Sequence, residues 1–164
     1  MRIAVIDSGP LINLVHLELA KELAFYFDLI YVPRAVQLEV NQTQRFRYRL
    51  QKLFKTRIFV KCSCSDKWNV ELLRPELDDG EAEGLIRAQE RRAEVFIGDE
   101  TRAREVSTKL GLKPVGTVRL LARLHLEGRA ADTAMLARKL RRDLRFRVSD
   151  KVISAAVELA REPI

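Results

Sequence analysis

Apolar residues follow two alternating patterns along this chain, short continuous runs and longer stretches with helical spacing. The first run, Ile3–Ile6, and a later one, Val95–Ile97, have the length and composition of strands buried on both faces of a parallel sheet. Less continuously apolar stretches at 31–33, 58–64 and 113–115 predict three further strands. Strands that alternate with helices favour an α/β fold with a parallel sheet and right-handed crossovers.

Helical spacing of apolar residues accounts for most of the remaining chain. Residues 66–75 lack this spacing and are expected to form an irregular connector that holds the only tryptophan, Trp68. One helix is expected to begin at Asp78 or Asp79. The other expected helices cover residues 11–27 (one bent helix or two short ones), 34–41, 44–57, 101–111, 118–126, 132–144 and 149–161.

An acid ends the first apolar run. Asp7 stands at the expected carboxyl end of the strand, where open α/β sheets bind their ligands. Ser8, Gly9 and Pro10 are suited to a turn that opens a helix at Leu11. Asp7 can therefore belong to a functional site, or it can cap the helix, since Asp and Ser are both common capping residues. This stretch alone leaves both interpretations open.

Three further acids can reach the same edge of the sheet. Asp99 repeats the arrangement around Asp7, because it follows an apolar run and precedes a helical stretch. Glu39 lies near the apolar face of its expected helix, which is unfavourable for a carboxylate unless another group holds it. Glu81 falls in the first turns of a helix. Since parallel strands end at one edge, the helices beside them can bring all four acids together there.

Carboxylates gathered in this way raise one another's pKa unless a cation compensates them. Oxygen ligands alone favour a hard ion, Mg²⁺ or Mn²⁺. Zinc does not fit, because His16 and His125 are isolated and Cys62 and Cys64 have no matching second pair. Both histidines are expected to be ordinary helix residues. A metal held by carboxylates on a basic protein suits phosphodiester hydrolysis, because the metal activates water and stabilises charge on the phosphate.

The composition agrees with one globular domain that has an anionic partner. A chain of 164 residues with 47% hydrophobic composition can bury a single core. Its net charge of +7 favours RNA or DNA as partner, although an arginine-rich surface can also reflect habitat or base composition. Cys62 and Cys64 lie too close in sequence to bridge well, so free thiols in a reducing cytosol are expected. No signal sequence or long apolar stretch is found, so we expect a cytoplasmic protein without a membrane partner.

Residues 44–57 stand out because basic residues alternate with apolar and aromatic ones and no acid lies between them. This composition is typical of an element that faces nucleic acid or a protein partner. The alternative is an amphipathic helix that packs Phe46, Leu50, Leu53 and Phe54 inward and leaves its arginines in solvent, and the two interpretations are compatible. We therefore expect a single domain, 1–164, with a basic helical insert at about residues 42–57.

Four motifs follow one another along nearly the whole chain: IAVIDSGPLINL, VPRAVQLEV, LDDGEAEGLIRA and VFIGDETRAREVSTKLGLKPVGTVRLL. Their ordered set resembles a PIN domain, and in particular the branch of uncharacterised PIN-like proteins related to VapC-type toxins. The resemblance implies a three-layer α/β/α sandwich with a central, mainly parallel sheet. It also implies a metal-dependent ribonuclease site built from acids.

The resemblance assigns roles to individual acids. Asp7 matches the first acid of the family, Glu39 the acid of the VP…V…E motif, Glu81 that of the following helix and Asp99 that after the later strand. These four are the expected catalytic and metal-binding residues, with Mg²⁺ or Mn²⁺ as cofactor, and Glu81 binds metal or orients the attacking water. Glu100 is a further candidate ligand, because this branch tends to have two consecutive aspartates there.

The chain departs from the family pattern in two places. Many PIN domains have Ser or Thr before the later acid, where this chain has Gly98, and the nearest hydroxyls in sequence are Ser8 and Thr101. We expect these two hydroxyls to support the metal ligands by hydrogen bonds. Asp79 and Glu83, on either side of the matched acid of the helix, are alternatives to it or cap and solvate that helix.

Together these features predict a metal-dependent endoribonuclease that acts on RNA, the toxin of a toxin–antitoxin pair. The resemblance implies a small antitoxin protein as partner and a homodimer. One alternative is a non-catalytic PIN-like module that binds RNA or protein. Another is a phosphatase or phosphotransferase with Asp7 as nucleophile, but that chemistry usually needs a second acid where this chain has Gly9. The residues expected to hold RNA phosphates are Arg45, Arg47, Arg49, Lys52, Arg102 and Arg104.

Overall fold

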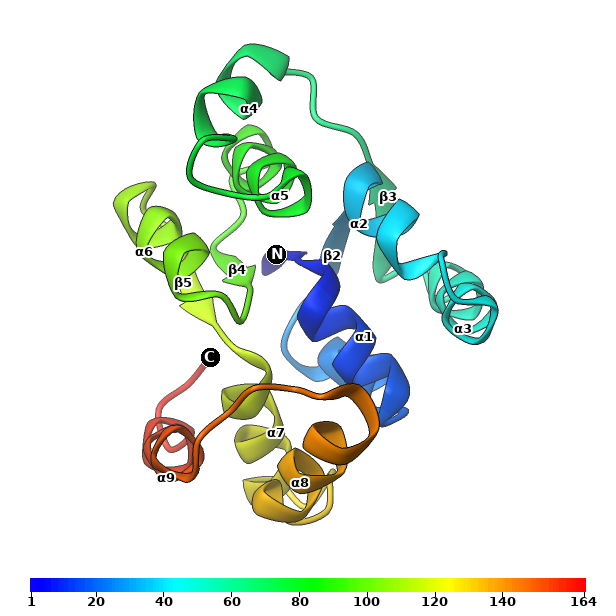
Figure 1. Cartoon of the computed structure of the whole chain (residues 1–164), viewed down its shortest axis with the longest axis vertical. Coiled ribbons are helices and arrows are strands. Elements are labelled where there is room, and N and C mark those ends of the chain that lie inside the picture. The colour runs from blue at the N-terminus through cyan, green and yellow to red at the C-terminus, as the bar shows by residue number, and fades with distance from the viewer. The chain divides into compact units, whose positions relative to one another are not determined.

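The computed structural model describes residues 1–164, and the chain divides into two compact units, Met1–Val115 and Gly116–Ile164. Figure 1 shows the first unit in blue to yellow-green and the second in yellow to red. None of the helices has the length and apolar composition needed to cross a membrane.

The first unit is built on a parallel sheet of five strands, in the order β3-β2-β1-β4-β5. The central strand β1 pairs with β2 on one side and β4 on the other, so that Val5 lies opposite Tyr31 and Phe96. Ala4, Val5 and Ile6 are completely buried, as a central strand covered on both faces requires. The strands are β1 Ile3–Ile6, β2 Leu29–Pro33, β3 Phe59–Cys62, β4 Val95–Ile97 and β5 Lys113–Val115.

Helices flank this sheet, which confirms the expected α/β sandwich with a parallel sheet. One side of the core joins Val5 and Phe96 of the sheet to Leu85, Ala103 and other buried residues of the helices. The helical elements of this unit are α1 Ser8–His16, the 3-10 helix η1 Ala20–Phe25, α2 Arg34–Val40, α3 Gln44–Phe54, α4 Lys67–Leu73, α5 Asp79–Glu90 and α6 Thr101–Lys109.

Two expectations about this unit were wrong. Helix α1 begins at Ser8 rather than Leu11. Proline at position 10 does not prevent this, because the N–H groups of a helix's first turn have no partner within the helix and the one that Pro10 lacks is not missed. Residues 66–75 are not irregular but contain α4. The Asp66 side chain caps this helix by accepting a hydrogen bond from the Asn69 N–H at 3.1 Å, and Val70 anchors it in the core.

The basic stretch forms helix α3, as its amphipathic pattern predicts. Leu50 and Leu53 are buried, whereas Phe46 and Phe54 are only half-buried. The prediction of two free thiols is also confirmed, with Cys62 at the end of β3 buried.

The second unit contains three helices, α7 Thr117–Leu126, α8 Thr133–Leu144 and α9 Asp150–Leu159, close to their expected bounds. Val118, Ala137, Ile153 and Ala156 form its small core, one or two residues from each helix. Asp132 caps α8 and Ser149 caps α9 through side-chain hydrogen bonds to the first turns.

Candidate functional site

Asp7 is placed by the end of β1 and the start of α1. Its N–H donates to the Ile97 carbonyl at 2.9 Å, and its own carbonyl accepts the N–H of Leu11, which begins the helix. Its side chain makes no capping hydrogen bond, and Oδ1 is buried without any partner. The interpretation of the Asp7 carboxylate as a helix cap was therefore wrong, and the carboxylate is left available for another role.

The surroundings of Asp7 strongly favour its neutral form. Burial is the largest cause and, together with the negative charges of Asp78, Glu81 and Glu39, raises the Asp7 pKa from 3.8 to about 8, although a backbone hydrogen bond from Ser8 opposes the rise. Only 5% of the residue is exposed. Acids whose pKa is raised this strongly are found more often at functional sites than at purely structural positions.

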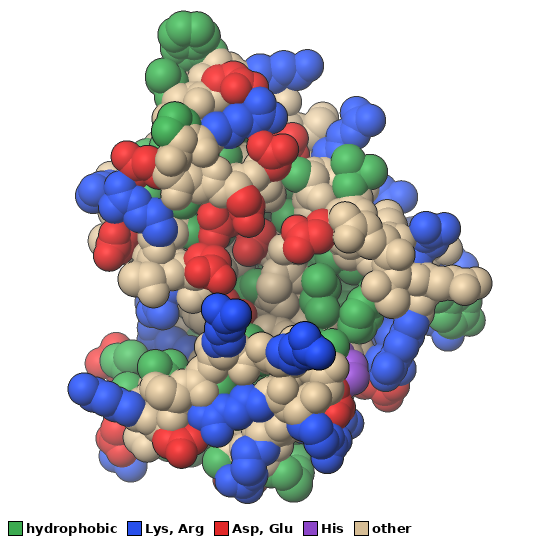
Figure 2. All heavy atoms as spheres, viewed as in Figure 1, with side chains coloured by type: hydrophobic (Ala, Val, Ile, Leu, Met, Phe, Trp, Pro, Cys, Tyr) green, Lys and Arg blue, Asp and Glu red, His purple; other side chains and the backbone are tan.

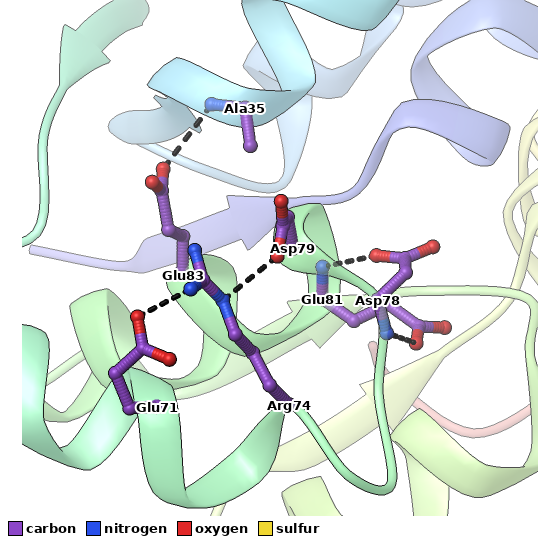
Figure 3. Close-up of polar contacts among 7 residues, drawn as sticks. All are labelled: Ala35, Glu71, Arg74, Asp78, Asp79, Glu81 and Glu83. Atoms are coloured by element: carbon purple, nitrogen blue, oxygen red, sulfur yellow. Dashed lines mark hydrogen bonds and ion pairs between the residues drawn. The ribbon is translucent and has the colours of Figure 1, made fainter.

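Glu81 and Asp78 form a reciprocal cap at the start of α5 (Figure 3). Asp78 Oδ1 accepts the Glu81 N–H at 2.8 Å, and Glu81 Oε2 accepts the Asp78 N–H at 3.1 Å. The second oxygen of Glu81, Oε1, is buried and has no partner. Burial, followed by the charges of Asp78, Glu100 and Glu39, raises the Glu81 pKa to about 6 against the backbone hydrogen bond from Asp78.

Gly80 lets the start of α5 approach Asp7 closely. A Cβ at this position would lie 3.3 Å from Asp7 Oδ1 and 3.4 Å from a methyl carbon of Val36. Any larger residue would therefore press against the unpartnered oxygen. The absence of a side chain therefore lets the start of α5 pack closely against the Asp7 carboxylate.

Asp99 lies at the same edge of the sheet as Asp7, because β1 and β4 run parallel and pair Ile6 with Ile97. Its Oδ2 accepts a hydrogen bond from Asn13 Nδ2 at 3.3 Å, and a Cβ on Gly9 would lie 3.9 Å from the same oxygen. The first turns of α1 thus contact the Asp99 carboxylate directly. The expectation that strand ends bring two aspartates to one edge is confirmed.

The structure leaves no room at Gly98 for the Ser or Thr that many PIN domains have before the later acid. A Cβ on Gly98 would lie only 2.4 Å from Cε1 of the Phe96 ring, which is completely buried. A serine at this position would therefore require the ring to move. Of the two hydroxyl residues considered instead, Ser8 is buried next to Asp7, whereas Thr101 is exposed at the start of α6.

Glu39 and Glu100 are both exposed at this edge. The expectation that Glu39 lies near the apolar face of α2 was wrong, because Val36 and Val40 alone take the buried positions and Glu39 turns to solvent. Glu39 lines a shallow depression with Asp78 and Gly80. In Figure 2 acidic side chains gather over the part of the surface where α5 begins.

The two alternatives to Glu81 have partners of their own (Figure 3). Asp79 pairs with Arg74, whose Nε lies 2.9 Å from Oδ1, and Arg74 also contacts Glu71. Glu83 Oε2 accepts the N–H of Ala35 at 3.1 Å and so fastens α5 to α2. Neither acid has an unpartnered buried oxygen, which leaves Glu81 as the acid of this helix best suited to the site.

Two carboxylate oxygens of the site are of the type that a hard divalent cation prefers as ligands. They are Asp7 Oδ1 and Glu81 Oε1, which are buried without hydrogen bonds. Burial first, and then the charges of neighbouring acids, raises the pKa of both groups. No group of three or more His, Cys, Asp or Glu side chains has an arrangement that could hold a metal ion. The assignment of Asp7, Glu39, Glu81, Asp99 and Glu100 as metal ligands therefore stays a prediction.

Several of the arginines expected to hold RNA phosphates are bound within the protein. Arg47 donates to the Asn41 carbonyl, and Arg49 donates to the Val15 carbonyl and pairs with Glu18 at 2.8 Å. Arg102 pairs with two acids, Glu76 and Glu105.

The other three expected phosphate contacts remain accessible. Lys52 lies over the ring of Tyr48, 4.5 Å from its centroid, and is exposed. Arg45 and Arg104 are exposed and their guanidinium groups form no ion pair. Of the six candidates, these three are therefore best placed to contact a ligand.

The structure adds three residues that sequence reasoning did not place in the site. Asp78 was expected only to start a helix, yet it forms the reciprocal cap with Glu81, and its charge raises the pKa of Asp7. The D-x-x-E spacing of a capping box could have shown that it lies close to Glu81. Asn13 and Gly80 act through contacts between distant segments, and no local pattern reveals them.

The sequence was compared with known proteins. No curated protein matches it. A family model described as a PIN domain matches residues 3–162, nearly the whole chain. The chain belongs to the PIN-domain family.

Proposed function

We propose that this protein is a metal-dependent endoribonuclease whose site is formed by Asp7, Glu81 and Asp99, with Glu39 and Glu100 beside them. PIN domains are generally nucleases, which supports phosphodiester hydrolysis as the reaction class. The observation that carries the proposal is the Asp7 carboxylate, which is buried at the end of β1 with one oxygen unpartnered and negative charges around it.

Asp7, Asp99 and Glu81 are the residues that would hold Mg²⁺ or Mn²⁺. When bound, the ion would activate water and stabilise the charge that develops on the phosphate. Asp7 must release its proton for such binding, since its pKa of about 8 keeps it mostly protonated at neutral pH. Asn13 holds the Asp99 carboxylate in place by its hydrogen bond.

Glu81 is suited to accept a proton from the attacking water. Its pKa of about 6 makes it largely ionised at neutral pH and still basic enough for proton transfer. Its position is fixed by the reciprocal hydrogen bonds with Asp78. Oε1 is the Glu81 oxygen without a hydrogen bond, so it is the atom that would contact either the metal or the attacking water.

The resemblance to VapC-type toxins supports three further proposals. The protein would act as the toxin of a toxin–antitoxin pair in the cytoplasm, bind a small antitoxin protein, and form a homodimer. Co-expression with neighbouring small reading frames, followed by size-exclusion chromatography, would test the antitoxin proposal.

The nuclease proposal is tested by cleavage of a panel of single-stranded RNAs with Mn²⁺, Mg²⁺ or EDTA. We expect metal-dependent cleavage by the wild type and a loss of about 100-fold or more in Asp7→Asn. Asp79→Asn is the matched control, because it removes a neighbouring acid that pairs with Arg74 instead. Equal cleavage by wild type and Asp7→Asn, or cleavage that EDTA does not affect, would contradict the proposal.

The alternative function is a non-catalytic module that binds RNA or protein. It would be favoured by a folded wild type that binds RNA, cleaves no member of the panel, and shows no affinity for Mn²⁺ at millimolar concentration. The same preparations serve both experiments.

A further inference from the structure

The excess of positive charge is concentrated in the second unit. Residues 116–164 contain 11 Lys and Arg and 6 Asp and Glu, a net charge of +5 out of +7 for the whole chain. Residues 1–115, which hold all the acids of the proposed active site, contain 19 basic and 17 acidic residues. The basic character that points to a polyanionic partner therefore lies mainly outside the unit that carries the site.

Helix α8 concentrates this charge on one face. Its apolar residues Leu136, Ala137 and Leu140 are buried, and Ala137 packs in the core with residues of α7 and α9. Arg138 and Arg142 are separated by four residues and therefore share the opposite, exposed face. The exposed cations of this helix and of the loop that follows it form the α8 stripe, defined as Arg138, Lys139, Arg142, Arg145 and Arg147.

The cations of the α8 stripe are almost free of partners within the protein. Four of them form no side-chain hydrogen bond or ion pair, and Arg142 pairs only with its neighbour Asp143, at 2.7 Å. Arg141, in contrast, donates to the Val148 carbonyl and pairs with Asp150, so its role is to hold the loop. The distinction separates cations that stabilise the fold from cations that are available to a ligand.

Arg145 occupies a backbone position that arginine does not favour. It ends α8 in the left-handed conformation, with φ 55° and ψ 30°, where glycine or asparagine is usually found. The residue is exposed, so packing does not explain the choice of side chain. An arginine here extends the stripe beyond the end of the helix.

The chemistry of the stripe favours the phosphate backbone of a nucleic acid. A membrane-bound helix needs a free apolar face, and the apolar face of α8 is used in the core of its own unit. Arginine guanidinium groups bind phosphate oxygens through paired hydrogen bonds. Figure 2 shows Lys and Arg side chains over the surface of these C-terminal helices.

We propose that the α8 stripe is an RNA-binding surface that contacts the phosphate backbone without reading sequence. The choice of RNA as the nucleic acid rests on the proposed ribonuclease function. The stripe supplies binding affinity and belongs to a different unit from the acids that would carry out cleavage.

The test compares RNA binding by two variants that lose the same charge. One carries Arg138→Gln, Arg145→Gln and Arg147→Gln. The control carries Lys67→Gln, Arg92→Gln and Lys109→Gln, three exposed cations of the first unit. Arg92 also has a positive φ, 50°, so each variant places one glutamine in the same strained conformation. Circular dichroism would show that both variants are folded.

Binding is measured by fluorescence anisotropy of a labelled single-stranded RNA in EDTA over a range of salt concentrations. If each removed cation contacts one phosphate, the slope of log K against log salt becomes shallower by about 2, and affinity at about 0.1 M salt falls about 100-fold. The control variant should bind like the wild type. Equal affinities of the stripe variant and the control would overturn the inference, including the case in which the stripe binds an acidic protein instead.

Failure of this inference is distinguishable from failure of the nuclease proposal. Metal-dependent cleavage by the wild type, together with unchanged RNA binding by the stripe variant, overturns only the RNA-binding surface. RNA binding that depends on the stripe in a protein that cleaves no RNA overturns only the nuclease proposal.

Discussion

Replacing Asp7 by asparagine should stabilise the protein when no metal is present. The asparagine side chain has nearly the shape of a protonated aspartate but cannot ionise, so the substitution removes the cost of a buried charge among negative neighbours. The sign follows from the raised pKa. Because the folded state holds the Asp7 proton more tightly than the unfolded chain, the stability of the wild type falls as the pH rises from about 4 to about 8.

The magnitude follows from the pKa of Asp7, which rises from 3.8 in the unfolded chain to about 8 in the folded protein. Each pH unit between these values costs about 1.4 kcal/mol, so Asp7→Asn should be about 4 kcal/mol more stable than the wild type at pH 7. At pH 4 the free energies of unfolding of the two proteins should be nearly equal.

The assay is urea unfolding in EDTA at pH 4, 5, 6 and 7, followed by circular dichroism. Asp79→Asn is the control, because Asp79 is exposed and pairs with Arg74, and its difference from wild type should not grow with pH in this way. Parallel pH dependence of wild type and Asp7→Asn would refute the reasoning, since it would mean that Asp7 ionises freely in the folded protein.

Three further predictions concern residues other than the proposed metal ligands. Gly98→Ser should lower the free energy of unfolding by about 2 kcal/mol, because its Cβ would meet the Phe96 ring at 2.4 Å, and an unchanged melting temperature would contradict this. Asp78→Ala should lower the free energy of unfolding by about 1 kcal/mol, because α5 loses its cap, whereas Asp78→Ser can still cap the helix and should not. Equal melting temperatures of the two variants would be inconsistent with the capping role. Burial raises the pKa of both thiols, Cys62 and Cys64, to about 11. The folded protein should therefore react slowly with iodoacetamide at pH 8 and rapidly only in urea. Fast reaction of the folded protein would contradict this prediction.

The sequence predicts the sheet well because each strand is marked by an apolar run within a few consecutive residues. Ile3–Ile6 and Val95–Ile97 are short apolar runs of the kind found in strands buried on both faces, and both are strands in the structure. Once two such strands are taken as parallel, Asp7 and Asp99 must lie at one edge, and the pairing of the two strands confirms it. This part of the candidate site therefore follows from the apolar pattern and topology alone.

The remaining features depend on contacts that no local pattern contains. The exposure of Glu39 depends on which face of α2 packs against the core. The spacing of two apolar residues, Val36 and Val40, does not determine the limits of that face to a single residue. Whether an arginine is free or bound depends on distant carbonyls and acids, as with Arg49 and Glu18. Helix α4 was missed because one buried residue, Val70, and a cap at Asp66 suffice to hold it.

The central claim, that the acids around Asp7 form a divalent-cation site, is tested most directly by isothermal titration of the wild type and Asp7→Asn with Mn²⁺. We predict saturable binding by the wild type that is lost in Asp7→Asn. Below pH 8 binding should release a proton, because Asp7 is protonated there without metal, so the measured heat should depend on the ionisation enthalpy of the buffer. Absence of binding at millimolar Mn²⁺, or equal binding by the two proteins, would contradict the claim.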